Sequence, residues 1–216
     1  MLGGAIAVWN DMTDYLENGI SEYDVYDRLQ NAIPLFGAKL WGKGDKTLDQ
    51  ANSLRTTLGD APGTNFGYEA AKDENGMIAH YDLDNLDQLK DHENIELASL
   101  DSHDALRLLG NKSYATTSFS TVGLNNDLRV KVKRESSSEE EQILFESSYG
   151  SIKAVQKETG KVGLSRENHD YSFNYELPVN QWVELEFKNR KEVIDLYVNG
   201  QLVDTLGDDE QVVVDH

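Results

Sequence analysis

From Met77 to Leu206 the chain consists of short runs in which apolar and polar residues alternate, a period of two that is typical of β-strands. The runs recur about every ten residues, with turn residues between them. Asn199-Gly200 is the dipeptide typical of a two-residue hairpin, and the charged run Glu135 to Glu141 predicts a solvated loop. We therefore predict an antiparallel sandwich or jelly roll with strands in MIAHYDL, ALRLLG, SYATTSF, DLRVKVKRE, EQILFES, SIKAVQ, KVGLSR, DYSFNYEL, QWVELEF and EVIDLYVNGQLV.

The first eleven residues, MLGGAIAVWND, have a different pattern. Ala5 to Val8 are apolar without alternation, which predicts a fully buried strand. This strand ends in Trp9 and Asp11. Ligands sit at the carboxyl ends of strands in parallel α/β folds, so these two residues stand where a site is expected.

A helix is predicted to follow from Ser21. Ser21 and Asp24 form a capping-box-like pair at its start, Pro34 predicts a kink near its middle, and Trp41-Gly42 marks its end. One face is apolar at three- and four-residue spacing, which predicts packing inward by Val25, Leu29, Ile33, Phe36 and Leu40.

A second, shorter helix is predicted from about Leu48 to Leu58, with Thr47 and Gln50 as its capping pair and Gly59 as its stop. A strand followed by helices makes a β/α unit, which folds only within a larger sheet. We therefore divide the chain into residues 1–59, a linker over 60–76, and the sandwich over 77–216.

Composition excludes several classes of function. The 20 basic and 39 acidic residues give a net charge of −19, which argues against nucleic acid or an anionic membrane as partner. The chain has no Cys, hence no disulfide, thiolate metal site or cysteine nucleophile. No run of about 20 apolar residues predicts membrane insertion, and no leader is evident.

The sequence contains no motif for a metal or a nucleotide cofactor. The His residues lack zinc-site spacing, and the acids Asp82, Asp84 and Asp87 lack the rest of a calcium loop. No nucleotide motif is present, so we expect neither metal nor cofactor.

Trp9 and Asp11 are two residues apart, so an extended chain can point both toward one ligand. A pyranose ring suits this pair, because its axial hydrogens stack on an indole and its hydroxyls donate to a carboxylate. The alternative is a core Trp beside a loop-ordering Asp, which is the more common use of a Trp.

The segment LGGAIAVWND, followed by DYLENGISEYDVYDRLQNAIPLFGAKLWG, resembles the last part of the barrel in glycoside hydrolase family 20, the β-N-acetylhexosaminidases. In that family a late barrel strand ends in Trp-x-Glu, where the Trp lines the sugar pocket and the acid binds outer hydroxyls. Trp9 and Asp11 match it as substrate-binding residues, with the shorter Asp in place of Glu. The resemblance implies that residues 1–59 are the last strand and helices of a (β/α)8 TIM-type barrel.

The same family implies a substrate-assisted retaining mechanism, in which the substrate's acetamido oxygen attacks the anomeric carbon and an adjacent Asp-Glu pair assists. The only Asp-Glu pairs here are Asp73-Glu74 in the linker and Asp209-Glu210 in the acidic tail, and neither follows a buried strand. We therefore expect no catalytic residue in this chain, which the resemblance identifies as a C-terminal fragment that is inactive alone.

The β-rich half resembles the laminin-G-like, concanavalin A-like jelly roll often appended to secreted bacterial glycosidases, in IAHYDLDNL, ALRLLGNKSYATT, QILFESSYGSIKA, LPVNQWVELEF and LYVNGQLV. Tyr171, Phe173 and Tyr175 alternate, so they predict either a sugar-stacking platform or, more commonly, an inward-facing core row. Trp182 is expected in the core as well.

The fold class expected is mixed, a terminal β/α unit of a TIM-type barrel plus an all-β antiparallel jelly-roll sandwich. The function expected is that of an extracellular or cell-surface β-N-acetylhexosaminidase that acts on glycans with terminal N-acetylhexosamine. The alternative is a non-catalytic carbohydrate-binding or cell-surface interaction module, with Tyr171 and Tyr175 as glycan contacts. A third possibility is that the jelly roll only braces the barrel.

Overall fold

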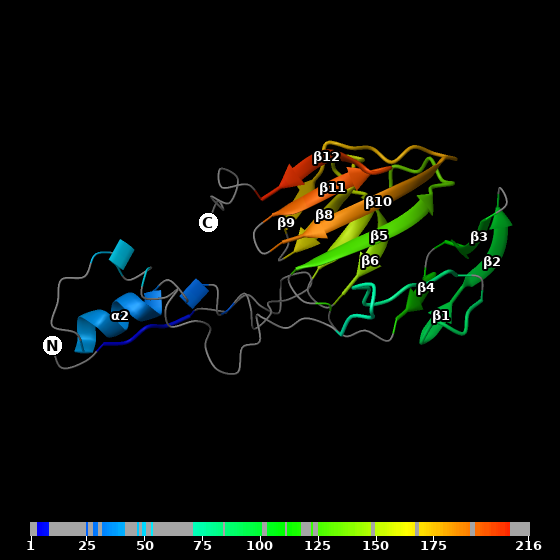
Figure 1. The fold of residues 1–216 in the computed structure, drawn as a ribbon. Coiled ribbons are helices and arrows are strands. Elements are labelled where there is room, and N and C mark those ends of the chain that lie inside the picture. The colour runs from blue at the N-terminus through cyan, green and yellow to red at the C-terminus, as the bar shows by residue number, and fades with distance from the viewer. Residues whose placement is uncertain are drawn as a thin grey trace. The chain divides into compact units, whose positions relative to one another are not determined.

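The computed structural model describes residues 4–8, 25, 28–29, 32–41, 47, 49–50, 53, 71–83, 85–100, 103–110, 112–117, 122, 125–147, 150–166, 169–190 and 193–207. The chain divides into two compact units, one formed by residues 1–66 with 125–216 and the other by residues 67–124. The regular secondary structure described in both is mainly antiparallel strands (Figure 1).

Two four-stranded antiparallel sheets form the sandwich (Figure 1). The first sheet has the order β12-β11-β10-β5, and the second has the order β6-β7-β8-β9. The predicted antiparallel sandwich is therefore confirmed for this part of the chain. Its strands are β5 (Asn126–Lys133), β6 (Gln142–Glu146), β7 (Ser151–Val155), β8 (Gly163–Arg166), β9 (His169–Ser172), β10 (Trp182–Asn189), β11 (Ile194–Val198) and β12 (Gln201–Leu206).

The core lies between the two sheets. Phe187 of β10 and Phe173, which follows β9, are both fully buried, and their ring centroids are 6.1 Å apart. Burying each aromatic ring contributes roughly 1.5–3 kcal/mol, so this pair is a major link between the sheets. The other buried apolar residues are Ala154, Val155, Val162, Leu177, Val183, Leu185 and Leu196.

Trp182 is an exception to the prediction, because it is not in this core. Side chains alternate along β10, and Val183 and Leu185 are the ones that face inward. Trp182 therefore lies on the outer face, where it is half-buried and the Nζ atom of Lys131 is 5.6 Å from its ring centroid. The alternation of a strand determines which face a residue takes, whatever its hydrophobicity.

The Asn199-Gly200 hairpin is confirmed. Val198 of β11 pairs with Gln201 of β12, and the two turn residues have φ angles of 49° and 79°. Positive φ at both positions is what a type I′ turn requires. Asn199 also holds the turn to β10, because its side-chain oxygen accepts a hydrogen bond from the backbone N–H of Glu184 at 3.0 Å.

The charged run from Glu135 to Glu141 is an exposed loop, as predicted. It connects β5 of the first sheet to β6 of the second. Arg134 orders this loop by donating to the carbonyl oxygen of Ser138 at 2.6 Å and to that of Leu177 at 3.3 Å.

The unit over residues 67–124 contains two strand pairs. β1 (Asp91–Glu93) pairs with β4 (Tyr114–Thr116), and β2 (Ile95–Leu100) pairs with β3 (His103–Leu108). Asn94, with a φ of 52°, separates β1 from β2. The sequence pattern predicts strands in the segments of β3 and β4 but not in those of β1 and β2.

The predicted strand in MIAHYDL is wrong, since residues 77–83 form no strand. Met77 closes a turn in which its backbone N–H donates to the Asp73 side chain at 2.7 Å. Leu83 has a φ of 57°, which a strand does not allow. The alternation is present there, but among the described residues no strand pairs with this segment.

The N-terminal region differs from the prediction in two ways. Residues 4–8 form no strand, and Ile6 is 39% exposed, because the described residues include no neighbouring strand for them. The predicted helix from Ser21 is helical at Val25, Arg28 and Leu29 and over α2 (Ala32–Trp41), which contains Pro34. Ile33, expected to pack inward, is 48% exposed.

The capping pair of the second predicted helix is confirmed. The Thr47 backbone N–H donates to Gln50 Oε1 at 3.1 Å, and the Gln50 backbone N–H donates to Thr47 Oγ1 at 3.3 Å. Asp49, Gln50 and Ser53 are helical. Ser21, Asp24, Gly42 and Gly59 lie outside the described residues, as does most of the predicted linker.

Candidate functional site

The two residues predicted to line a sugar pocket, Trp9 and Asp11, lie outside the described residues. Of the predicted glycan contacts in the sandwich, the structure describes both Tyr171 and Tyr175. The candidate functional site in the described residues therefore comprises β9 and the face of the second sheet beside it.

Tyr171 and Tyr175 differ in their surroundings. Tyr171 is 41% exposed at the edge strand β9, and its ring centroid is 6.5 Å from that of His169. Tyr175 packs against the core, and burial raises the pKa of its hydroxyl. Phe173 between them is fully buried. The three rings form no common exposed platform, and Tyr171 is the one that offers a ring to a ligand.

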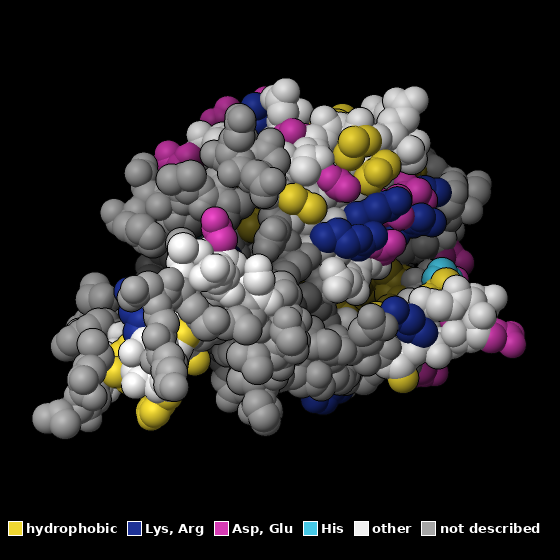
Figure 2. Space-filling model, turned by 60° about the vertical axis from the view of Figure 1, so that its left-hand side comes forward, with side chains coloured by type: hydrophobic (Ala, Val, Ile, Leu, Met, Phe, Trp, Pro, Cys, Tyr) yellow, Lys and Arg dark blue, Asp and Glu magenta, His cyan; other side chains and the backbone are white. Residues whose placement is uncertain are grey.

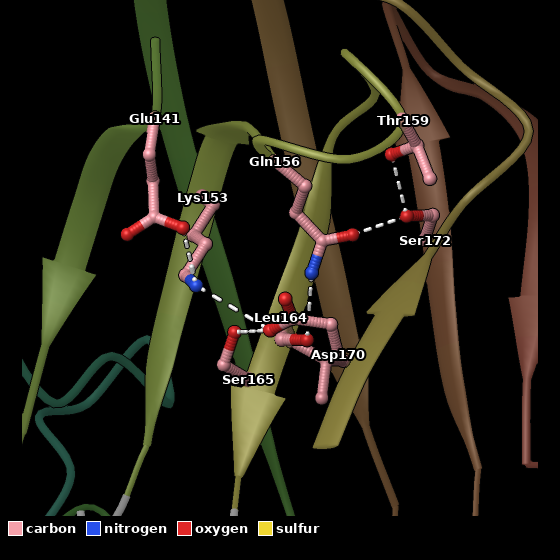
Figure 3. A network of polar contacts seen from close by, with 8 residues as sticks. All are labelled: Glu141, Lys153, Gln156, Thr159, Leu164, Ser165, Asp170 and Ser172. Atoms are coloured by element: carbon pink, nitrogen blue, oxygen red, sulfur yellow. Dashed lines mark hydrogen bonds and ion pairs between the residues drawn. The ribbon is translucent and has the colours of Figure 1, made fainter. Parts of the chain in front are cut away.

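A chain of polar contacts crosses the second sheet on the face opposite the core (Figure 3). Its central residue is Lys153 of β7, whose side chain is only 2% exposed. The Nζ atom of Lys153 lies 2.7 Å from Glu141 Oε2 and 3.4 Å from Asp170 Oδ1. Ser165 of β8 donates its hydroxyl to the same Asp170 oxygen. One ammonium thus connects the residue before β6 to the edge strand β9.

The charge of Lys153 is maintained by these partners. Burial lowers the pKa of the Lys153 ammonium, but its hydrogen bond to Glu141 and the negative charges of Glu141 and Asp170 outweigh the effect of burial, and the net result is a raised pKa. A fully buried Lys is rare in proteins unless it is paired in this way. The two carboxylates are less buried, with side chains 33% and 47% exposed.

A second group of contacts continues along the same face, beside the turn between β7 and β8 (Figure 3). Gln156, which is 1% exposed, donates from Nε2 to the carbonyl oxygen of Leu164 at 3.0 Å and accepts a hydrogen bond from the Ser172 hydroxyl. Thr159 lies 2.8 Å from that hydroxyl. Gly163 makes room for the Gln156 side chain, because a Cβ on Gly163 would collide with it.

The first sheet has a different outer face, where paired charges predominate. Arg129 of β5 donates to Glu186 at 2.8 Å, and the Nζ atom of Lys188 lies 4.3 Å from the ring centroid of Tyr197. Figure 2 shows one face of the molecule, on which Lys and Arg side chains likewise lie beside Asp and Glu side chains. Exposed pairs of this kind stabilise little, and they present no single sign of charge to a ligand.

The Lys153 network was not foreseen from the sequence. The segment SIKAV predicts a strand in which Lys153 faces away from the core, and such a Lys is normally solvated. Its burial depends on Glu141 and Asp170, which are far from it along the chain, so no local signal identifies it. Within the described ranges, no group of three or more His, Asp or Glu side chains is arranged to hold a metal ion.

Comparison with known proteins adds no assignment to these observations. No protein-family model matches the chain, and no similar sequence was found among curated proteins. None of the helices in the described part of the chain is long and apolar enough to cross a membrane.

Proposed function

We propose that this chain is the C-terminal part of a β-N-acetylhexosaminidase of glycoside hydrolase family 20. In this proposal, residues 1–59 are the last strand and helices of its (β/α)8 barrel, and the sandwich is a laminin-G-like, concanavalin A-like accessory domain. The proposal rests on the sequence resemblance around Trp9 and Asp11. It implies an extracellular or cell-surface enzyme whose substrates are glycans with terminal N-acetylhexosamine.

One structural observation supports a barrel origin for the N-terminal segment. A Cβ on Gly4 would lie 2.9 Å from the Phe36 ring and 3.4 Å from Leu40, so Gly4 lies close against α2. Residues 4–7 are exposed, Ile6 by 39%. An apolar segment that meets its own helix at Gly4 and has no strand beside it among the described residues suits a strand of a larger parallel sheet.

In this enzyme, Trp9 and Asp11 bind the sugar, and neither transfers a proton. The Trp9 indole stacks on the pyranose ring, while the Asp11 carboxylate accepts hydrogen bonds from its hydroxyls. The acid that protonates the leaving oxygen comes from an earlier strand of the barrel. The chain alone should therefore bind sugar weakly and hydrolyse nothing.

A hydrolysis assay tests the proposal. The chain alone should not cleave 4-nitrophenyl N-acetyl-β-glucosaminide, whereas the longer enzyme encoded by the same reading frame should. In that enzyme, Asp11→Ala should lower kcat/KM roughly 5- to 150-fold, since it leaves substrate hydroxyls unpaired at a cost of about 1–3 kcal/mol. Failure of the longer enzyme to hydrolyse the substrate would refute the proposal.

Glu74→Gln is the matched control for the catalytic assignment. Glu74 belongs to an Asp-Glu pair, as the catalytic residues of the family do, but the pair lies in the exposed turn that Asp73 closes. The variant should keep full activity. Turnover by the chain alone, lost in Glu74→Gln, would mean that the acid was assigned to the wrong region.

A non-catalytic carbohydrate-binding module is the second candidate. The exposed ring of Tyr171 favours it, because such a ring can stack on a sugar. A glycan array that compares the isolated chain with its Tyr171→Ala variant separates the two candidates, since only this module binds glycans through Tyr171. If the chain binds no glycan on a broad array, the sandwich only braces the barrel.

A further inference from the structure

We propose that the free edge of β5 binds an extended acidic peptide. The peptide adds to the first sheet as a further strand, and its carboxylates pair with Arg129, Lys131 and Lys133 of β5. This edge gives the sandwich a protein partner, in addition to the glycan of the proposed function and independent of it.

β5 differs from the other edge strands of the sandwich in its length and regularity. It pairs with β10 over all eight of its residues in one continuous register, and among the described residues no other strand pairs with it. The edge strands β12 and β6 carry register shifts, and β9 has only four residues. Bulges and short length are the usual means of keeping an edge from pairing with another chain. Because β5 has neither, a further strand can pair along its whole length.

The side chains of β5 place a row of positive charge beside this free edge. Arg129, Lys131 and Lys133 share the outer face of the first sheet, because they alternate with residues that pack against the core. The acid in the same row, Asp127, lies 2.7 Å from the guanidinium of Arg190 and is neutralised by it. Every second residue of β5 directs its backbone N–H and C=O away from β10, so a strand at this edge meets main-chain partners and cations together.

The acids of β10 lie on the side of β5 away from its free edge. Arg129 contacts Glu186 of β10 at 2.8 Å, yet its side chain is still 61% exposed. Lys131 has no carboxylate partner among the described residues, and its Nζ atom lies 5.6 Å from the ring centroid of Trp182, also of β10. Neighbouring strands are about 4.8 Å apart, so an added strand lies beside the cations of β5 and about twice as far from the acids of β10. The face as a whole carries mixed charges, but its free edge is basic.

The basic row selects the kind of strand that can pair with β5. A second copy of β5, paired antiparallel with the first, would place Arg and Lys side chains opposite one another, and like charges in that position are destabilising. A strand with Asp or Glu at alternate positions instead places a carboxylate beside each cation while its main chain pairs with β5. The net charge of −19 repels such a peptide only weakly, because charges more than about 8 Å away are largely screened at physiological ionic strength.

The test is titration of the full chain with a peptide of alternating Glu and Val, as long as β5, followed by calorimetry and by NMR of the backbone amides. We expect binding, with shifts along β5 and slower hydrogen exchange of the β5 amides that point away from β10, because these amides donate to the peptide. Lys131→Gln should weaken binding about two- to fivefold, the effect of one exposed ion pair. Lys157→Gln removes the same charge in the exposed turn between β7 and β8 and should bind like the wild type.

A second peptide separates strand addition from simple attraction of charge. The same sequence with N-methylated backbone amides keeps its carboxylates but donates no main-chain hydrogen bonds, so it should not bind. If it binds as tightly as the parent peptide, the basic row attracts polyanions in general, acidic polysaccharides included, and strand addition is wrong. The proposal is also overturned if the parent peptide does not bind, or if the amide shifts of the wild-type chain map away from β5, a result that does not depend on how well the variants fold.

Discussion

Asp204 of β12 accepts a hydrogen bond from the backbone N–H of Asn174 at 2.7 Å. β12 is an edge strand of the first sheet, and Asn174 follows β9, the edge strand of the second. The other Asp204 oxygen accepts from the backbone N–H of Thr205 at 2.9 Å. The Asp204 carboxylate therefore connects the two sheets along one side of the sandwich. It also accepts from the Asn174 backbone N–H, which would otherwise be free to pair with another chain.

Asp204→Ala should destabilise the sandwich by about 1–3 kcal/mol, because it removes two hydrogen bonds to a charged acceptor. Urea unfolding measures the change. Glu158→Ala is the control, since Glu158 is an exposed acid in the turn between β7 and β8 and should change stability by less than about 0.5 kcal/mol. Equal effects of the two substitutions would show that the tie at Asp204 is not stabilising.

Gly163→Ala should destabilise the sandwich by about 1–3 kcal/mol through overpacking. A Cβ at this position collides with the side chain of Gln156 and with the backbone carbonyl of Tyr171. The Gln156 side chain could move only by giving up its buried hydrogen bonds, and the carbonyl of Tyr171 belongs to β9. Thermal unfolding of the variant checks this, together with the loss of the Gln156 side-chain amide signals in NMR.

Gly37→Ala is a matched control for this prediction. Gly37 lies inside α2, and a Cβ there would lie 4.0 Å from the Trp41 ring, an ordinary van der Waals distance. Because Ala is a better helix former than Gly by about 1 kcal/mol, this substitution should leave stability unchanged or raise it. A loss as large as that of Gly163→Ala would mean that the collision at Gly163 is not the cause.

The sequence predicts the sandwich well because local signals determine its strands. Alternation and turn residues are properties of neighbouring residues, and the Asn199-Gly200 turn forms as its φ preference requires. The strand prediction fails where strand formation depends on pairing with another segment. MIAHYDL has the alternation of a strand but pairs with none among the described residues, whereas IELASL, for which no strand is predicted, forms β2 by pairing with β3.

The candidate site shows the same limit. The exposed ring of Tyr171 and the buried one of Phe173 follow from their position relative to the core, which alternation alone does not give. Lys153 is buried through Glu141 and Asp170, contacts that bring together three separate segments. Side chains whose environment is built from distant segments are the ones that sequence patterns describe least well.

The stability of the sandwich should fall at alkaline pH. The pKa of Tyr175 is raised by burial, and that of Lys153 is raised because its carboxylate partners outweigh the effect of burial. A group with a raised pKa in the folded state contributes its full stability below the unfolded value, near 10 for both residue types, and loses it as pH rises through the folded value. Urea unfolding between neutral and strongly alkaline pH should show this decline. Lys153→Met should flatten it, whereas Lys157→Met, at an exposed position in the adjacent turn, should not.

Tyr171→Ala and Tyr175→Ala should separate ligand binding from folding. Tyr171 is exposed, so its loss should change stability by less than about 0.5 kcal/mol while weakening the binding of N,N′-diacetylchitobiose. Tyr175 packs against the core, so its truncation should cost about 2 kcal/mol or more and affect binding only through the fold. Calorimetry and urea unfolding on the same samples give both quantities. If Tyr171→Ala binds the disaccharide as tightly as the wild type, the ring makes no contact with the sugar, and the carbohydrate-binding module loses the observation that favours it.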